Sequence, residues 1–274
     1  MKGHIDRETA ARLMAPLTEL VVKAGEAILA VNRAAMRVEG KLDGSPVTEA
    51  DLAADRIIAE GLARLAPEVP TLSEERAEHA TPPFRDSFFL IDPLDGTKEF
   101  VAGRDEFTVN VAIITGGVPL LGIVAAPALG LAWRGIVGRG AERVRIDGGR
   151  IGTAEPIHTR TMPKAGDPWV AAVSRSHGDP RSEAFIASRP GVVRCALGSA
   201  VKFGRIAEGS VDIYPRFGPT SEWDVGAGCA VVTAAGGKVT DGQGGEIRFG
   251  EGRGGSFLVP EFVAWGDPGA VRSY

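Results

Sequence analysis

The sequence predicts a mixed α/β (α+β) fold, and the pattern of apolar residues in its two halves carries that prediction. In the first half, runs rich in Phe, Val, Ile and Thr indicate buried strands. In the second half, strand-like and helix-like segments alternate, which is typical of a largely parallel or mixed sheet with helices on its faces.

Two helices are expected at the start of the chain. Apolar residues recur at helical spacing from Leu13 to Val31 and predict an amphipathic helix of roughly six turns. A turn at Asp43-Gly44 then leads into a second helix, expected from Thr48 to about Leu65. Thr48 and Asp51 resemble a capping box with Asp in place of Glu. Asp51 is therefore explained equally well by helix capping and by a role in chemistry.

The strands of the first half follow these helices. A brief strand is expected at Val69–Leu72 and a buried one at Phe88–Ile91. Gly116-Gly117 predicts a hairpin turn between two paired central strands. The central strands and their continuation are expected at Thr108–Thr115, Val118–Ala126 and Leu131–Val137.

A change of pattern then predicts a domain boundary. We expect an exposed hairpin or loop at Arg139–Arg150 and a connection rich in turn formers at Thr153–Pro168. The boundary is placed in this connection, which gives domains of residues 1–155 and 156–274. The segments expected beyond it are strands at 169–173, 192–196, 211–215, 238–240 and 256–260, and helices at 179–188, 199–208 and 224–235.

The composition of the 274-residue chain excludes several classes of protein. Its 31 Lys and Arg against 35 Asp and Glu give a net charge of −4, unlike a protein that binds nucleic-acid polymers or anionic membranes. The uncharged stretch Phe107–Trp133 is interrupted by Gly and Pro, so no membrane span is expected. The charged start lacks the apolar core of a signal peptide, so none is expected, and Cys195 and Cys229 are expected to be reduced core cysteines. We expect a cytoplasmic protein, with peripheral membrane association left open.

Chemistry-bearing residues concentrate in the segment Phe88–Phe100. Asp92 and Asp95 lie on what the sequence predicts is a tight turn, and they repel each other unless a cation lies between them. Hard oxygen ligands of this kind suit Mg²⁺ or Mn²⁺. Thr97 stands where a short helix is expected to begin, and a helix N-terminus presents N–H groups to phosphate. The segment indicates metal-assisted phosphate chemistry; the alternative is a simple Asp-Gly surface turn.

Other polar groups have both a functional and a structural interpretation. Glu74-Glu75 either shares the metal of the paired aspartates or is solvated surface. Asp224 stands at the start of a helix, where an N-cap is the alternative. Ser174-Arg175-Ser176-His177 follows a strand end and suits anion binding. Lys202 lies one helical turn from Ser199, so both can face one ligand, although a helix-surface cation is equally consistent.

Three acidic motifs in this order resemble the inositol monophosphatase superfamily of Mg²⁺-dependent, lithium-sensitive phosphatases: Glu74-Glu75, Asp92-Pro-Leu-Asp95-Gly-Thr97 and Trp223-Asp224. Further motifs are similar to those of the 3′(2′),5′-bisphosphate nucleotidases within it: Asp43–Thr48, Leu72–Glu75, Glu106–Asn110, Ser174–His177 and Tyr214–Pro219. The resemblance extends from about Leu13 to Val263. It implies a layered α-β-α-β-α sandwich with the active site between the two halves.

The resemblance also implies a role for each matching residue. The implied metal ligands are Glu74, Asp92, Asp95, Asp224 and the carbonyl of Leu94. The implied catalytic residues are Glu74 and Thr97, which position and deprotonate water, and Asp51, which orients Thr97. The implied substrate-binding residues are Gly96, Thr97, His177, Ser199, Lys202, Arg216 and Asp224.

The expected function is hydrolysis of adenosine 3′,5′-bisphosphate, or its sulfated form, by roughly two or three Mg²⁺ ions, with Mn²⁺ as a substitute. One alternative is an inositol or sugar monophosphatase of the same superfamily. The polar groups at Ser174–His177 and Tyr214–Arg216 favour the nucleotide, because a small polyol has no second phosphate to occupy them. A non-catalytic nucleotide-binding regulator is the other alternative. The expected partner is a small molecule, and a homodimer is left open.

Overall fold

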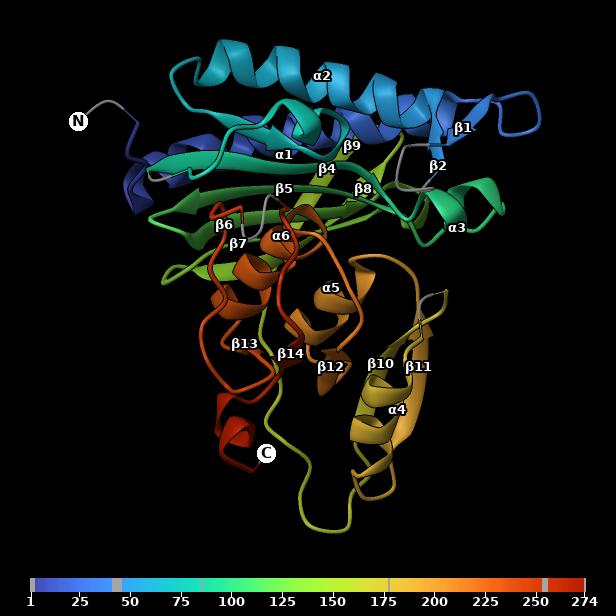
Figure 1. Ribbon diagram of the computed structural model, residues 1–274, viewed down its shortest axis with the longest axis vertical. Helices are drawn as coiled ribbons and strands as arrows, with labels where there is room; N and C mark the ends of the chain where they lie inside the picture. The colour runs from blue at the N-terminus through green and yellow to red at the C-terminus, as the bar shows by residue number, and fades with distance from the viewer. Residues whose placement is uncertain (1–2, 41–45, 85, 177, 253–255, 274) are drawn as a thin grey trace.

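The computed structural model describes residues 3–40, 46–84, 86–176, 178–252 and 256–273, and these form alternating layers of helix and sheet (Figure 1). Helices α1 and α2 cover one face of a seven-stranded sheet, and α5 and α6 lie between that sheet and a five-stranded sheet. Helix α4 packs on the outer face of the second sheet. The layered sandwich expected from the sequence is confirmed.

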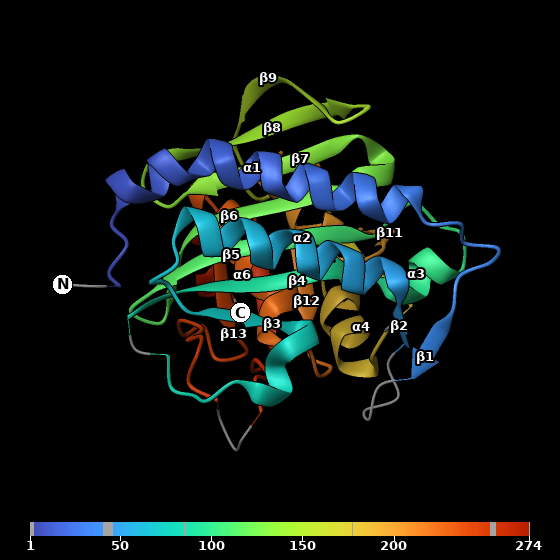
Figure 2. The ribbon, with the colours of Figure 1, turned by 90° about the horizontal axis from the view of Figure 1, so that it is seen from above.

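Helices α1 (Arg7–Ala30) and α2 (Glu49–Leu65) lie side by side across the first sheet (Figure 2). Helix α1 begins earlier than the apolar pattern predicts, because the Asp6 side chain caps it by accepting a hydrogen bond of 2.8 Å from the Thr9 N–H. Helix α2 begins where expected, with the capping box of Thr48 and Asp51. The short strands β1 (Val38–Gly40) and β2 (Pro46–Thr48) precede it. The predicted turn at Asp43-Gly44 lies outside the described residues.

The first sheet has the strand order β3-β4-β5-β6-β7-β8-β9, in which only the pairing of β3 with β4 is parallel. Its strands are β3 (Thr71–Ser73), β4 (Ser87–Asp95), β5 (Thr108–Thr115), β6 (Val118–Ala126), β7 (Leu131–Ile136), β8 (Gly140–Asp147) and β9 (Arg150–Ile157). Alternate side chains of β4 serve two cores: Phe89 and Ile91 face α1 and α2, and Phe88 and Leu90 face the middle layer. Burial on both faces explains the continuous apolar run.

Strand β9 differs from the prediction. Residues 153–157, expected in a connection, continue the edge strand and pair with β8. Seven of the eight residues of β9 are exposed or half-buried, so its hydrophobicity pattern does not reveal a strand. The connection between the sheets therefore begins after Ile157. The division of the chain into two domains at residue 155 remains a prediction.

The second sheet has the order β11-β10-β12-β14-β13 and is mixed, as expected. Its strands are β10 (Val170–Ser174), β11 (Val193–Leu197), β12 (Ile213–Arg216), β13 (Lys238–Asp241) and β14 (Phe262–Trp265), and α4 spans Pro180–Ala187. The strand predicted at 256–260 is wrong: Leu258 makes only an isolated bridge with Ser221, and the strand forms at β14 instead. All four residues of β14 are buried between β12 and β13, so the sheet takes the segment with more apolar side chains to bury.

The middle layer consists of α5 (Val201–Ala207) and α6 (Glu222–Ala234). Glycine inside a helix costs about 1 kcal/mol relative to Ala, yet α6 carries Gly226 and Gly228. A Cβ atom at Gly226 would lie 2.6 Å from Leu90 Cδ2, and one at Gly228 would lie 2.3 Å from the Phe203 ring. The two glycines therefore let α6 approach the sheet and α5 closely.

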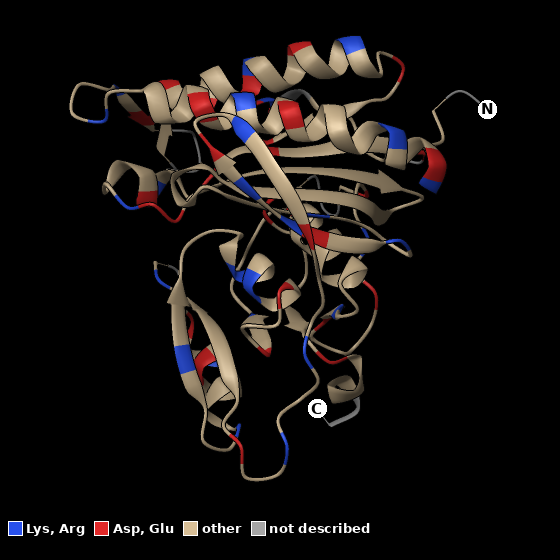
Figure 3. Ribbon diagram, turned by 180° about the vertical axis from the view of Figure 1, so that it is seen from behind, with Lys and Arg blue, Asp and Glu red and all other residues tan. Residues whose placement is uncertain are grey.

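Basic and acidic positions are interspersed along the outer helices (Figure 3). No helix in the described part of the chain is both long and apolar enough to cross a membrane.

Candidate active site

Strand β4 places two carboxylates on one side of the first sheet. Side chains three residues apart in a regular strand point to opposite faces, but the pairing of β4 with β5 contains a bulge. Asp92 pairs with Asn110 and Asp95 with Thr108, so β4 has one extra residue between them. The segment is a bulged strand, which corrects the predicted tight turn, and the bulge turns Asp95 toward Asp92.

Helix α6 brings a third carboxylate from the other half of the chain. Ser221 is the N-cap, and Asp224 completes a capping box with it, so the predicted alternative of Asp224 as the N-cap is wrong. Asp224 Oδ2 accepts hydrogen bonds from Thr220 Oγ1 at 2.7 Å and from the Ser221 N–H at 3.1 Å. One carboxylate oxygen from each of Asp92, Asp95 and Asp224 lies within 4.8 Å of the others. We call these three residues the acidic trio.

The electrostatics of the acidic trio favour a bound cation. Burial, followed by the charges of Glu74 and Asp95, raises the pKa of Asp92 well above its ordinary value. Burial and the charge of Asp95 raise the pKa of Asp224 from 3.8 to about 6. Oxygen donors in this arrangement fit a hard divalent cation, which would relieve the repulsion.

Two further predicted ligands lie next to the acidic trio. Glu74 is the first residue of the 3₁₀ helix Glu74–His79, directly after β3, and it lines the same cavity as Asp95 and Asp224. Leu94 lies in the bulge, where its N–H donates a hydrogen bond of 3.0 Å to Asp92 Oδ1. Its carbonyl oxygen accepts a hydrogen bond of 3.2 Å from Thr97 Oγ1.

Thr97 and Asp51 form a hydrogen-bonded pair beside the trio. Thr97 opens α3 (Thr97–Val101), and its hydroxyl donates to Asp51 Oδ1 at 2.9 Å. The other oxygen of Asp51 accepts hydrogen bonds from the Thr48 N–H at 2.8 Å and from the Thr48 hydroxyl at 2.6 Å. The two interpretations of Asp51 are therefore compatible, because one carboxylate caps α2 and orients Thr97. Burial raises the pKa of Asp51. Gly96 before Thr97 has a φ of 90°, which favours glycine.

A turn from the second half holds Asp95, a contact that the sequence did not predict. Asp95 Oδ2 accepts hydrogen bonds from Ser199 Oγ at 2.6 Å and from the Ala200 N–H at 2.7 Å. Thr108 Oγ1 and Asn110 Nδ2 of β5 also donate to Oδ2, at 3.3 and 3.5 Å. Ser199 has a φ of 53°, an uncommon conformation for a residue other than glycine. The sequence did contain a signal that Thr108 and Asn110 belong to the site, because both lie in the motif Glu106–Asn110, which follows the segment Phe88–Phe100.

A cavity of about 490 Å³ joins these groups to basic residues of the second half. Its wall includes Glu74, the Asp95–Glu99 segment, Ser199, Lys202, Tyr214, Arg216 and Asp224. A neighbouring cavity of about 390 Å³ shares Ser174 and Arg216 with it. The structure therefore brings together the described residues that the sequence predicted to act on phosphate and on substrate. His177 lies outside the described residues.

Lys202 is not the surface cation that the sequence left open. Only 4% of the residue is exposed, and its ammonium group donates to the Ser199 carbonyl at 2.6 Å. The Lys202 Nζ also lies 5.1 Å from the centroid of the Tyr214 ring. Burial lowers the pKa of Lys202 to about 8. Arg216 donates to the Pro219 carbonyl at 2.9 Å. Both residues line the cavity together with Asp95 and Asp224.

Comparison with known proteins identifies the family. A model of the inositol monophosphatase family matches residues 10–263. This chain belongs to that family. Among its relatives, the 3′(2′),5′-bisphosphate nucleotidase CysQ of Escherichia coli K12 is 38% identical over 252 residues, which cover 89% of this chain and 96% of the relative. CysQ of Salmonella typhimurium is 38% identical over 258 residues, 91% of this chain and 98% of the relative.

Two solved structures agree with the fold. The crystal structure of CysQ from Bacteroides thetaiotaomicron aligns with a TM-score of 0.72 at 30% identity, over 92% of this chain and 96% of that one. The suhB protein of Bartonella henselae aligns with a TM-score of 0.73 at 23% identity, over 95% and 96% of the two chains. The family is metal-dependent, which agrees with the donor chemistry of the acidic trio.

Proposed function

We propose that this member of the inositol monophosphatase family is a Mg²⁺-dependent 3′(2′),5′-bisphosphate nucleotidase that converts adenosine 3′,5′-bisphosphate to AMP and phosphate, and acts also on the sulfated form. One observation carries the proposal: Asp95, Asp224 and Thr97 line a cavity of about 490 Å³ together with Lys202 and Arg216, and Asp92 and Asp51 lie directly behind this lining as partners of Asp95 and Thr97. A metal held by the carboxylates and the two basic side chains would together suit a substrate with two phosphates. The CysQ names of the relatives support the same substrate class.

The metal would be held by residues from both halves. We propose Glu74, Asp92, Asp95, Asp224 and the Leu94 carbonyl as its ligands, for roughly two or three Mg²⁺ ions with Mn²⁺ as a substitute. When bound, Mg²⁺ supplies Lewis-acid stabilisation of phosphoryl charge and lowers the pKa of water.

The residues of the chain position the reacting groups. The Thr97 hydroxyl donates its hydrogen bond to Asp51, so its oxygen is left to accept a hydrogen bond from the attacking water and orient it. Glu74 is assigned the role of general base, which accepts a proton from that water. The N–H groups of Gly96 and Thr97 hold the phosphate being removed, and Asp224 contacts the sugar. Ser199, Lys202, Arg216 and His177 are assigned to the remainder of the nucleotide.

Two alternative functions account for fewer of the residues at the site. An inositol or sugar monophosphatase would use the same metal centre, but it would leave Arg216 and the neighbouring cavity of about 390 Å³ without a phosphate or base to bind. A non-catalytic binder would not need acidic groups that repel each other in the absence of metal. The cytoplasmic location remains a prediction of the sequence, which leaves the oligomeric state open.

Phosphate release with Mg²⁺ tests the proposal directly. Adenosine 3′,5′-bisphosphate, inositol 1-phosphate and fructose 1,6-bisphosphate would be assayed in parallel. We expect kcat/KM to be highest for the nucleotide, because it alone offers a second phosphate together with a base. A preference for inositol phosphate would retain the metal chemistry and reject the substrate, whereas no release from any of the three would favour the binder.

The raised carboxyl pKa values predict a pH-dependent effect of metal on stability. The pKa of Asp224 is about 6 in the folded protein against an ordinary value of 3.8, so the native state binds protons more tightly than the unfolded state. The stability of the metal-free protein therefore falls as the pH rises from about 4 through 6. Bound Mg²⁺ competes with these protons. We expect the gain in Tm on adding Mg²⁺ to be larger at about pH 7 than at about pH 5; an equal gain at both would contradict this electrostatic account.

A further inference from the structure

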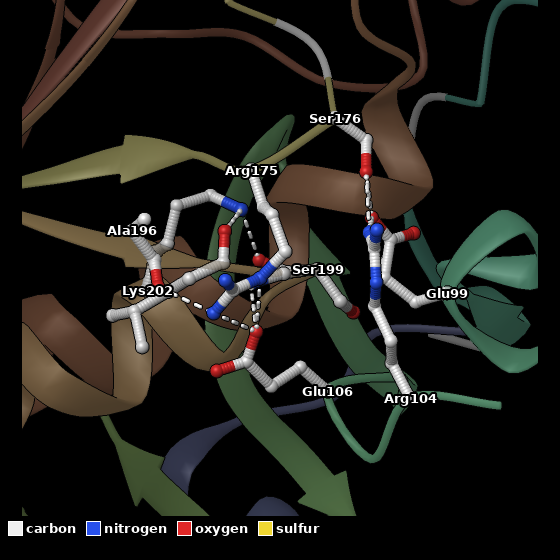
Figure 4. Close-up of polar contacts among 10 residues, drawn as sticks. Glu99, Arg104, Glu106, Arg175, Ser176, Ala196, Ser199 and Lys202 are labelled. Carbon is white, nitrogen blue, oxygen red and sulfur yellow. Dashed lines mark hydrogen bonds and ion pairs between the residues drawn. The ribbon is translucent and has the colours of Figure 1, made fainter. Parts of the chain in front are cut away.

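An ion pair joins the two halves of the chain just outside the acidic trio. Glu106 lies in the first half, two residues before β5, and Arg175 directly follows β10 in the second half (Figure 4). Glu106 Oε2 lies 3.0 Å from Arg175 Nε and 2.8 Å from Arg175 Nη2. Their side chains are 20% and 37% exposed, so the charges are partly screened and the pairing acts chiefly through its geometry.

The ion pair holds the end of β11 at several points. The Gly198 N–H donates to Glu106 Oε2 at 2.9 Å, and Arg175 Nη2 donates to the Ala196 carbonyl at 2.7 Å. The Arg175 N–H also donates to the Leu197 carbonyl at 3.1 Å. A Cβ atom at Gly198 would lie 2.6 Å from the Glu106 carbonyl oxygen. Residues 196–198 are therefore seated closely on Glu106, where only glycine fits at 198.

The next two residues hold Asp95. Ser199 Oγ and the Ala200 N–H donate to Asp95 Oδ2 at 2.6 and 2.7 Å. Figure 4 shows Ser199 beside the Arg175–Glu106 pair, with Lys202 also near it. A shift of the 196–198 segment would move both donors and let the Asp95 carboxylate rotate.

We propose that the Arg175–Glu106 ion pair positions Asp95 for metal binding, by fixing the 196–200 turn that holds Asp95 Oδ2 and so directs Oδ1 toward the cation. Arg175 is on this view a positioning residue, and not a ligand of substrate phosphate as its motif suggests. The inference rests on the proposed function, in that Asp95 is assigned there as a metal ligand.

The direction in which two substitutions change the cation affinity separates a positioning role from a direct electrostatic effect on the cation. Removing the positive charge with Arg175→Gln would strengthen cation binding through space, and removing the negative charge with Glu106→Gln would weaken it. If the ion pair instead positions Asp95, both variants are expected to weaken cation binding. Loss of groups that orient metal ligands typically lowers metal affinity about 10- to 100-fold. Arg175→Lys should also weaken binding, because a lysine keeps the charge but cannot contact Glu106 and the Ala196 carbonyl in the same fork geometry.

The experiment is calorimetric titration of Mn²⁺ into the full-length protein without substrate. We expect the Kd for Mn²⁺ to rise about tenfold in Arg175→Gln and in Glu106→Gln. The double variant should be little worse than either single one, because both remove the same contact. Arg194→Gln is the matched control, since it breaks an exposed ion pair with Glu183 elsewhere on β11, and it should bind Mn²⁺ like the wild type. Each variant's Tm without metal is compared with that of this control.

Each of the following results would overturn the inference. Unchanged Mn²⁺ affinity with a raised KM in Arg175→Gln alone would make Arg175 a substrate ligand. Opposite shifts in the two single variants would leave only through-space electrostatics. A loss of Mn²⁺ affinity that follows the fall in Tm across all variants, including Arg194→Gln, would indicate general destabilisation. A wild-type protein that does not bind Mn²⁺ would reject the proposed function and this inference together, whereas wild-type binding with unaffected variants rejects the inference alone.

Discussion

Asp95→Asn is expected to lower kcat/KM at least about a hundredfold while the protein remains folded. Ser199 Oγ, the Ala200 N–H and Asn110 Nδ2 all donate to Asp95 Oδ2. An asparagine at this position would turn its one oxygen toward those donors. Its amide nitrogen, which carries hydrogens and no charge, would then face the cation. The substitution thus removes a metal ligand without removing the hydrogen bonds that tie the two halves together.

Thermal melting with and without Mg²⁺ checks this prediction independently of substrate. The metal-free Tm of Asp95→Asn should equal or exceed that of the wild type, because one of several mutually repelling charges has been removed. The gain in Tm on adding Mg²⁺ should disappear. Asp55→Asn is the matched control: Asp55 accepts a hydrogen bond of 2.7 Å from Ser73 Oγ, outside the acidic trio, so its response to Mg²⁺ should persist. Undiminished turnover in Asp95→Asn would reject the metal assignment.

Most of the fold could be predicted because its elements leave strong local patterns. The runs at Phe88–Ile91 and Val111–Ile114 are apolar throughout since both faces of their strands, β4 and β5, are buried. Thr48 and Asp51 form the capping box that their spacing indicates. The errors occur where local pattern carries little information. Strand β9 is mostly exposed, so its residues show no apolar pattern. The strand expected at 256–260 does not form, and the sheet instead contains β14, which is buried between β12 and β13.

The candidate site divides in the same way. The acidic residues and Thr97 lie in short motifs, so their grouping could be predicted from the chain. The hydrogen bond from Ser199 to Asp95 joins residues 104 positions apart, and no local pattern encodes it. The burial of Lys202 also depends on tertiary packing, against Tyr214 and the Ser199 carbonyl. Arg175 was expected to bind an anion, but in the structure its guanidinium group forms an ion pair with Glu106.

Gly122→Ala is expected to destabilise the protein more than a typical surface substitution, by about 3 kcal/mol. Gly122 lies in the middle of β6, and a Cβ atom there would lie 2.2 Å from the Ala227 carbonyl oxygen and 2.8 Å from Ala230 Cβ. Both contacts belong to α6, whose backbone cannot yield as a flexible side chain would. For a chain of this size, the loss corresponds to a fall in Tm of roughly 6–12 °C. Gly40→Ala, where a Cβ would meet nothing within 4 Å, should change Tm by little.

The same substitution should also weaken metal binding at temperatures where the protein is folded. Helix α6 carries Asp224 in its first turn, so pushing the helix away from β6 displaces one carboxylate of the acidic trio from the two on β4. Titration of Mn²⁺ into Gly122→Ala well below its Tm should therefore show a higher Kd than for Gly40→Ala. A lower Tm with unchanged Mn²⁺ affinity would mean that α6 pivots about its N-terminal end, leaving Asp224 in place. Unchanged values of both would mean that the contact between α6 and the sheet is looser than these distances indicate. The geometry of the metal centre depends on the absence of a side chain at Gly122, because α6, which carries Asp224, packs at that point against the sheet whose strand β4 carries Asp92 and Asp95.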